Sequence, residues 1–278
     1  MNKIAVSVES SADLSAELIE KYDIKVIPYS ITLANEMIKD GEKSAEELFA
    51  FVDETGVLPK TTALNEVEYE DFFTALKNDY DVVIHFCLSG GITSSCDHAL
   101  RAAENVGKVF VIDSRSLSMG TGLLAIYARE LAIKDTPVSK IVESVKETVK
   151  KTVTSFVIER LDYLYKGGRC SSLALLGANL LKIRPRIVMK EGKMVSDKKY
   201  RGTMTAVISK FAEDLISEFT PVLDKVSITY TTAAPEMLNA AVNACKSAGF
   251  KEILINRAGA TIASHCGANT LGIFYIGE

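Results

Sequence analysis

The sequence predicts an α/β fold in two domains, at about 1–150 and 151–278, with the boundary uncertain by ten residues and a crossing segment left open. Strand-like and helix-like segments alternate along the first half, which is typical of a mainly parallel sheet covered by helices on both faces. After residue 151 a hairpin pattern joins this alternation and favours a mixed sheet. The chain has 278 residues, 47% of them hydrophobic, which suffices for two ordinary domains.

In the first domain, apolar β-rich runs are expected to alternate with helices. The expected strands are Ile4–Val8, Lys25–Ile31, Val82–Leu88 and Lys108–Ile112. The expected helices are Leu14–Tyr22, Ala45–Asp53, Val67–Asn78, Ser94–Val106 and 138–150. Gly120–Ala125 fits a loose dinucleotide fingerprint, but no acidic residue ends a strand about twenty residues later. A helix with close-packed glycines is the favoured interpretation there.

In the second domain, Ile183–Met189 and Met194–Tyr200 flank Glu191-Gly192-Lys193, which predicts a hairpin around a glycine turn. A helix follows, because five apolar residues between Met204 and Leu215 share one helical face. The other expected strands are Thr152–Ile158, Val226–Tyr230, Glu252–Asn256 and Leu271–Ile276, and Pro235–Ser247 is an expected helix.

Composition excludes several classes of protein. A net charge of −4 disfavours a general nucleic-acid binder, which would normally be basic. No stretch approaches the 18 or so apolar residues of a membrane span, and the N-terminus lacks the apolar core of a signal peptide. Five scattered cysteines without a Cys-x-x-Cys pair favour reduced thiols in the cytoplasm. The spacing of cysteines and histidines fits no zinc site, so no metal is expected.

Three hydroxyl-rich segments are expected to converge at one edge of the parallel sheet. The first, Ser89–Ser95, joins the apolar strand before it to a helix, and 59–63 and 113–118 carry further hydroxyls. Ligands of open parallel sheets lie at the carboxyl ends of the strands. Hydroxyls and helix-terminal N–H groups suit an anionic oxygen. The alternative, that Thr93 or Ser94 only caps the helix, stays open.

Other polar residues leave two rival functions open. A hydrolase-type enzyme would use Thr93, Ser94 or Ser95 as nucleophile with His265 as base. Pairing of His265 with Cys266 is disfavoured, because adjacent residues usually point apart. A nucleotide- or sugar-phosphate-binding protein would use the loops 89–95 and 120–122. The basic loop Lys166-Gly167-Gly168-Arg169 is either a solvated helix end or an anion-facing turn, and Arg201 has the same two interpretations. His85, in the middle of a strand, is most simply a core residue.

Taken together, the motifs along the whole chain resemble those of the DegV family, bacterial fatty-acid-binding proteins that include the FakB subunits of fatty acid kinase. They lie in the expected order: Val8-Glu9-Ser10-Ser11-Ala12-Asp13-Leu14, Pro59-Lys60-Thr61-Thr62-Ala63, Gly91-Ile92-Thr93-Ser94-Ser95, Val111-Ile112-Asp113-Ser114, Lys166-Gly167-Gly168-Arg169, Arg201 and His265-Cys266-Gly267. Glu9 stands where the family usually has Asp. The other departures from the family's usual sequence are Ala63, Thr93, Ser94, Ala268 and Asn269.

The resemblance implies two α/β domains with a long-chain fatty acid, such as palmitate, held between them. It assigns the fatty acid's carboxylate to Thr61 and Thr93, with Thr62, Ser94 and His265 beside them. It implies that Arg169 and Arg201 lie near the head group and face a partner. The apolar segments Leu173–Leu176 and Leu180–Ile183 are expected to line the acyl chain.

The function expected from this resemblance is lipid binding and transport without catalysis or a cofactor. The protein would shield the acyl chain from water and present its carboxyl group to an ATP-dependent fatty acid kinase. No nucleic-acid partner and no integral membrane segment are expected.

Overall fold

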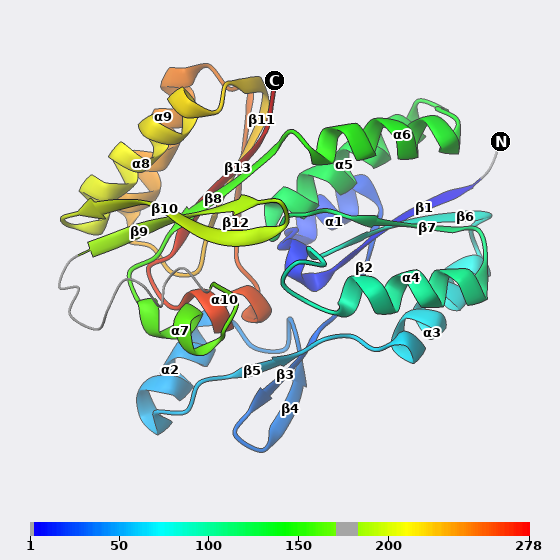
Figure 1. Cartoon of the computed structure of the whole chain (residues 1–278), viewed down its shortest axis with the longest axis horizontal. Helices are drawn as coiled ribbons and strands as arrows, with labels where there is room; N and C mark the ends of the chain where they lie inside the picture. The colour runs from blue at the N-terminus through cyan, green and yellow to red at the C-terminus, as the bar shows by residue number, and fades with distance from the viewer. Residues whose placement is uncertain (1–2, 171–182) are drawn as a thin grey trace.

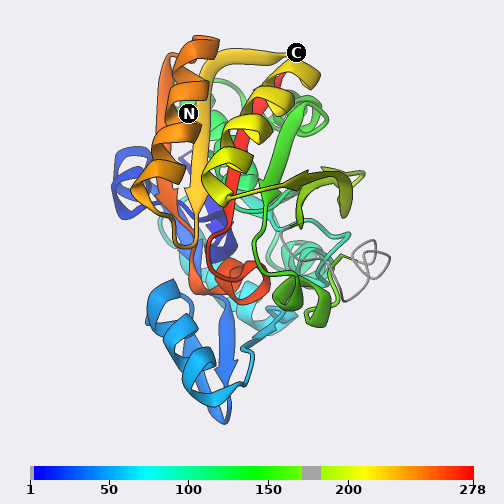
Figure 2. The ribbon, with the colours of Figure 1, turned by 90° about the vertical axis from the view of Figure 1, so that its left-hand side faces the viewer.

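The computed structural model describes residues 3–170 and 183–278, which form three sheets with their helices (Figure 1). One four-stranded sheet is parallel, a six-stranded sheet is mixed, and a small three-stranded sheet projects away from both (Figure 2). The predicted α/β fold, with a parallel first sheet and a mixed second sheet, is therefore confirmed.

The parallel sheet has the strand order β2-β1-β6-β7. Its strands are β1 (Ile4–Glu9), β2 (Ile24–Ile27), β6 (Val82–Cys87) and β7 (Val109–Asp113). Every residue of β6 is buried, as expected for an apolar strand with both faces covered. The covering helices are α1 (Ala16–Tyr22), α5 (Met119–Ile133) and α6 (Val138–Val149) on one face, and α3 (Glu66–Lys77) and α4 (Ser95–Val106) on the other (Figure 1).

The mixed sheet has the strand order β10-β9-β8-β13-β11-β12, and only its β11–β12 pair is parallel. Its strands are β8 (Thr152–Val157), β9 (Ile183–Lys190), β10 (Lys193–Arg201), β11 (Pro221–Tyr230), β12 (Glu252–Arg257) and β13 (Leu271–Gly277). Helices α8 (Met204–Glu218) and α9 (Pro235–Ala248) cover its outer face. The predicted β9–β10 hairpin is confirmed, with Gly192 at φ +78° in its turn.

The small sheet corrects two predictions. It joins β3 (Ser30–Leu33), β4 (Glu36–Lys39) and β5 (Lys60–Thr62) in antiparallel order beside α2 (Ala45–Thr55). The single strand expected at Lys25–Ile31 is wrong: the chain leaves the parallel sheet after Ile27, because Pro28 has no N–H for a ladder hydrogen bond. The segment 59–63 is likewise no loop at the parallel sheet's edge, since its Lys60–Thr62 pairs with β3.

Three short helices complete the described chain: the 3-10 helix η1 (Ser10–Ala12), α7 (Leu161–Lys166) and α10 (Ala260–Cys266). No element was predicted for α10. It nevertheless contacts α2, α7, β3, β5 and η1, and so connects the small sheet with both larger ones.

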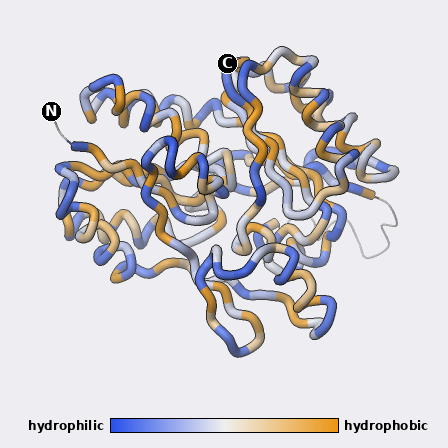
Figure 3. The backbone as a smooth tube through the Cα atoms, turned by 180° about the vertical axis from the view of Figure 1, so that it is seen from behind, coloured by the Kyte–Doolittle hydropathy of each residue, from blue (hydrophilic) through white to orange (hydrophobic). Residues whose placement is uncertain are grey.

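The two large sheets share one hydrophobic core. Phe156, Ile187 and Phe274 of the mixed sheet belong to the same buried cluster as Val83 and Phe86 of the parallel sheet. Figure 3 shows long hydrophobic runs along the central strands, whereas hydrophobic and hydrophilic residues alternate along the helices. Within residues 3–170 and 183–278, no helix combines the length and apolarity that a membrane span requires.

Candidate functional site

A cavity lies where the parallel sheet, the small sheet and α10 meet, with about 690 Å³ of empty space that is partly open to solvent. Its lining comes from the loops after β6 and β7, from β5, α7 and α10, and from the start of β10. The lining residues are Tyr29, Thr61, Ala63, Leu88, Ile92, Thr93, Ser94, Leu117, Leu164, Arg169, Met194, Thr261, Ile262, His265 and Cys266. Apolar side chains form most of this surface, so a ligand with a large apolar part fits it best.

Five of the seven predicted site residues line this cavity: Thr61, Thr93, Ser94, Arg169 and His265. The other two do not. Thr62 is exposed, because it follows Thr61 on β5 and consecutive strand residues point to opposite faces. Arg201 is exposed at the end of β10 and is outside the cavity lining.

Thr61 and His265 form a hydrogen-bonded pair across the cavity wall, with 2.8 Å between Thr61 Oγ1 and His265 Nε2. They are 204 residues apart in sequence. Two carboxylates hold α10 in place: Asp13 Oδ1 accepts from Gly259 N at 2.8 Å and Asp40 Oδ1 from Ala260 N at 2.9 Å. The first N–H groups of a helix have no partner within it, so these two hydrogen bonds fix the helix that carries the imidazole.

The imidazole of His265 is largely buried and neutral. Burial, reinforced by the nearby Arg169 guanidinium, lowers the pKa of His265 to about 4. Its Nδ1 is buried without a hydrogen-bond partner, and so is Oγ1 of Thr261, one helical turn away on α10. Buried polar atoms are rarely left unpaired, and two of them on one helix beside a cavity favour a ligand with polar atoms.

Arg169 is exposed although it lines the cavity, so it stands at the mouth. α7 ends at Lys166, and Gly168 then turns the chain with φ +70°, a conformation that glycine adopts without strain. The basic loop is therefore a helix end whose Arg169 lines the cavity, and its role as an anion-facing turn stays a prediction. Arg169 Nη1 donates to Gly167 O at 2.6 Å.

Thr93, which also lines the cavity, belongs to a chain of hydroxyl groups that leads into the core. Thr93 Oγ1 lies 3.1 Å from Ser95 Oγ, and Ser95 Oγ lies 2.9 Å from the hydroxyl of Tyr29. These three hydroxyls are called here the hydroxyl relay. Ser94 is the N-cap residue of α4, but its side chain makes no capping hydrogen bond, so its hydroxyl is not explained by capping.

The hydroxyl relay ends at the buried carboxyl of Glu9, which accepts from Tyr29 at 3.0 Å and from Leu88 N at 2.7 Å, both on Oε2. The hydroxyl of Tyr69 donates to Oε1. Complete burial outweighs these donors and raises the pKa of Glu9 to about 7. Glu9 thus changes charge near neutral pH, next to the cavity.

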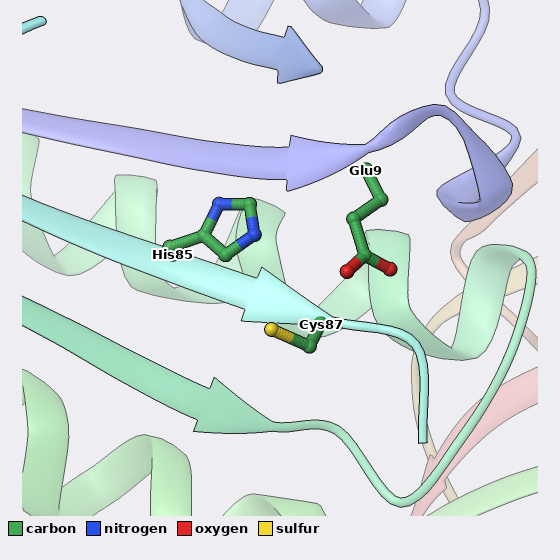
Figure 4. A group of neighbouring side chains, drawn as sticks. All are labelled: Glu9, His85 and Cys87. Atoms are coloured by element: carbon green, nitrogen blue, oxygen red, sulfur yellow. The ribbon is translucent and has the colours of Figure 1, made fainter. Parts of the chain in front are cut away.

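Glu9, His85 and Cys87 are also grouped as metal ligands would be (Figure 4), with ligand-type atoms within 4.8 Å of one another. Both Glu9 oxygens already accept hydrogen bonds, and His85 bonds Ser7 Oγ through Nδ1 at 2.9 Å. These hydrogen bonds make the three residues part of a buried polar network under α3. Burial lowers the pKa of His85 to about 3, in keeping with the predicted core histidine.

A family model described as "Uncharacterised protein, DegV family" matches residues 3–278. The chain belongs to the DegV family. A fatty acid-binding protein of Thermotoga maritima is 29% identical over 97% of this chain and 96% of its own length. A DegV domain-containing protein of Caldanaerobacter subterraneus is also 29% identical, over 99% of each chain.

Solved structures of similar proteins have the same fold. A fatty acid-binding DegV protein of Bacillus subtilis superimposes with a TM-score of 0.87 at 25% identity, covering all of both chains. A DegV family protein of Thermus thermophilus, described with fatty acid binding, gives 0.90 at 22% identity, covering 99% of this chain and all of its own. A stearic acid-binding protein of Eubacterium ventriosum gives a TM-score of 0.86 at 22% identity, covering 100% of this chain and 98% of its own.

Sequence patterns missed three features of this DegV-family site. Tyr29 and Met194 line the cavity, but no local pattern marks them. Thr261 could have been found, because it lies four residues before His265 and shares its helical face, had α10 been predicted. The acyl-chain linings expected at Leu173–Leu176 and Leu180–Ile183 lie outside the described residues, except Ile183 in β9.

The structure bears on both rival functions. Gly120 lies in the first turn of α5, packed against Ser116 and Thr154, so the predicted glycine-packed helix is confirmed and 120–122 offers no phosphate loop. His265 bonds Thr61 instead of the hydroxyls at 93–95. Within the described residues its Nδ1 has no acidic partner to orient it, which the hydrolase hypothesis requires.

Proposed function

We propose that this chain binds a long-chain fatty acid in the cavity, with the carboxylate at Thr61, Thr93 and His265 and the acyl chain along the apolar lining. The observation that carries the proposal is the cavity itself: a mostly apolar lining that includes the Thr61–His265 pair and two unpartnered buried polar atoms. DegV relatives named for fatty acid, vaccenic acid and stearic acid support it.

The apolar part of the ligand supplies most of the affinity. A sixteen-carbon chain such as palmitate buries roughly fifteen methylenes at ~0.8 kcal/mol each, about 12 kcal/mol before the costs of association. The lining residues Leu88, Ile92, Leu117, Leu164 and Ile262 supply apolar contacts for this chain.

The polar groups then only need to donate hydrogen bonds to a carboxylate. A neutral imidazole carries one N–H. When that proton is on Nε2, His265 donates to Thr61 Oγ1, which leaves the threonine hydrogen free for the ligand. Hydrogen bonds to a charged acceptor contribute about 1.5–3 kcal/mol each, enough to fix the position of the carboxylate.

The test is to identify what the purified protein holds. Native mass spectrometry of protein purified without added lipid, followed by lipid extraction, is expected to show one fatty acid per chain. Delipidated protein is expected to bind palmitate more tightly than hexadecane, because hexadecane has no carboxylate to accept hydrogen bonds from the polar groups. A protein that is empty and takes up no added fatty acid would refute the proposal.

We further propose that the protein, in the cytoplasm, presents the bound carboxyl group to an ATP-dependent fatty acid kinase and performs no catalysis itself. Arg169 supports this, because it is exposed at the mouth where a partner could reach it, and exposed Arg201 offers a second contact. The five cysteines lie in the described residues, where they are buried and form no disulfide, which suits a reducing compartment. Acyl phosphate formation by a fatty acid kinase should require this protein and fall with Arg169→Ala; equal turnover without the protein would refute the presentation role.

A further inference from the structure

The hydroxyl relay runs from a buried carboxyl group to the cavity. Its inner end meets Glu9 Oε2, 3.0 Å from the Tyr29 hydroxyl. Its outer end, Thr93, lines the cavity. The Ser95 N–H donates to Thr93 Oγ1 at 3.2 Å, so the threonine oxygen is already an acceptor and its own hydrogen is left to donate.

The relay holds too few protons to serve both ends. Tyr29, Ser95 and Thr93 have one hydroxyl hydrogen each. With Glu9 ionised and a ligand carboxylate at Thr93, there are four oxygen–oxygen pairs: Glu9–Tyr29, Tyr29–Ser95, Ser95–Thr93 and Thr93–ligand. Each pair needs one hydrogen, so three hydrogens leave one pair without a hydrogen bond. When Glu9 is protonated, its own O–H can donate to Tyr29. Tyr29 can then donate to Ser95, Ser95 to Thr93 and Thr93 to the ligand.

We propose that Glu9 and the ligand carboxylate compete for the hydroxyl relay, so that protonation of Glu9 strengthens carboxylate binding. This inference rests on the proposed function and adds a regulator that lies outside the cavity lining. Glu9 acts as a positioning residue, because it reaches the ligand only through the hydroxyls. By linkage, a bound carboxylate makes Glu9 harder to ionise to the same extent.

Glu9 is the group in this network that titrates near neutral pH. The groups facing it are Tyr69 from α3, Tyr29 beside β3, and His85 and Cys87 from β6. Burial raises the pKa of both tyrosines and of Cys87, and lowers the pKa of His85 to about 3. All four therefore stay neutral between pH 6 and 8.5, whereas the pKa of Glu9 is about 7.

The charge of Glu9 sets the direction in which pH changes the affinity. Below pH 7 Glu9 holds its proton and the relay is free for the ligand; above pH 7 the ionised carboxylate competes. Affinity should therefore fall as pH rises from 6 to 8.5, by about tenfold, the equilibrium equivalent of one hydrogen bond.

The experiment is calorimetric titration of the delipidated full chain with dodecanoate between pH 6 and 8.5. The wild type should bind about tenfold more weakly at pH 8.5 and take up protons on binding near pH 7. Glu9→Gln should bind with the same affinity at both ends of this range. Ser95→Ala cuts the relay without altering the cavity lining, and should also abolish the pH dependence.

Three outcomes separate the hypotheses. A pH dependence present in the wild type and absent in both variants supports the relay. Equal pH profiles in the wild type and Ser95→Ala overturn it while leaving fatty acid binding intact. No binding by the wild type at any pH overturns the proposed function as well. Circular dichroism of each variant establishes that it is folded, and Ser95→Ala decides the question if Glu9→Gln does not fold.

Discussion

Replacing Thr61 by Val tests the head-group assignment with a nearly isosteric change. Valine keeps the β-branched shape and suits β5, but it has no hydroxyl, so the ligand loses one donor and His265 Nε2 loses its partner at 2.8 Å. A hydrogen bond to a charged group is worth about 1.5–3 kcal/mol, which predicts a 10- to 150-fold weaker Kd for palmitate. The buried imidazole left unpaired should also cost about 1–3 kcal/mol in the free energy of unfolding.

Thr62→Val is the matched control, because it makes the same chemical change one residue along the same strand. Thr62 is exposed and outside the cavity lining, so its Kd should stay within about twofold of the wild type. Fluorescent fatty acid displacement measures both constants, and urea denaturation measures both stabilities. If Thr61→Val binds palmitate as tightly as Thr62→Val does, Thr61 does not hold the carboxylate.

Three further predictions follow from charge, protonation and packing. Arg169→Gln should weaken palmitate binding about three- to tenfold at low salt and less at 1 M salt, and should raise the pKa of His265, which proton NMR can follow. His85 is neutral in the folded protein, because burial lowers its pKa to about 3, so its contribution to stability is lost as pH falls below 6.5. Relative to His85→Gln, the wild type should lose about 2 kcal/mol between pH 6.5 and 4.5 in urea denaturation. Gly120→Ala would place a Cβ against two buried hydroxyl side chains and should destabilise the protein by about 3 kcal/mol, whereas Gly41→Ala, with open space around it and φ +104°, should cost about 1 kcal/mol in thermal denaturation.

Local sequence patterns predicted the fold well where one physical cause dominated. The strand Val82–Leu88 was predicted from an unbroken apolar run, and β6 is buried along its whole length. The hairpin at Glu191-Gly192-Lys193 was predicted from a turn that needs positive φ, which both Glu191 and Gly192 adopt. By contrast, Lys25–Ile31 contains two strands of different sheets, and only the missing N–H of Pro28 hinted at the break.

The motifs predicted only some of the residues that share the cavity, because the contacts that bring these residues together are long-range. The Thr61–His265 hydrogen bond spans 204 residues and depends on α10, which no periodicity revealed. Glu9 was noted only as a departure from the family's usual Asp. Its link to the cavity passes through Tyr29, 20 residues away, and could be found only from coordinates.

The protonation states of the site would suit reversible binding of an anion in this partly open cavity. Burial makes His265 neutral by lowering its pKa and favours a neutral Glu9 by raising its pKa, so near pH 6 neither adds a full charge beside the ligand. Among the lining residues that the structure describes, Arg169 alone carries a full positive charge, and it is exposed at the mouth. On the proposed function, hydrogen bonds from neutral groups would hold the carboxylate inside, while the attraction of Arg169 would be weakened by water and salt. Such a site can bind the head group specifically and still release it to a partner, because no buried ion pair has to be broken.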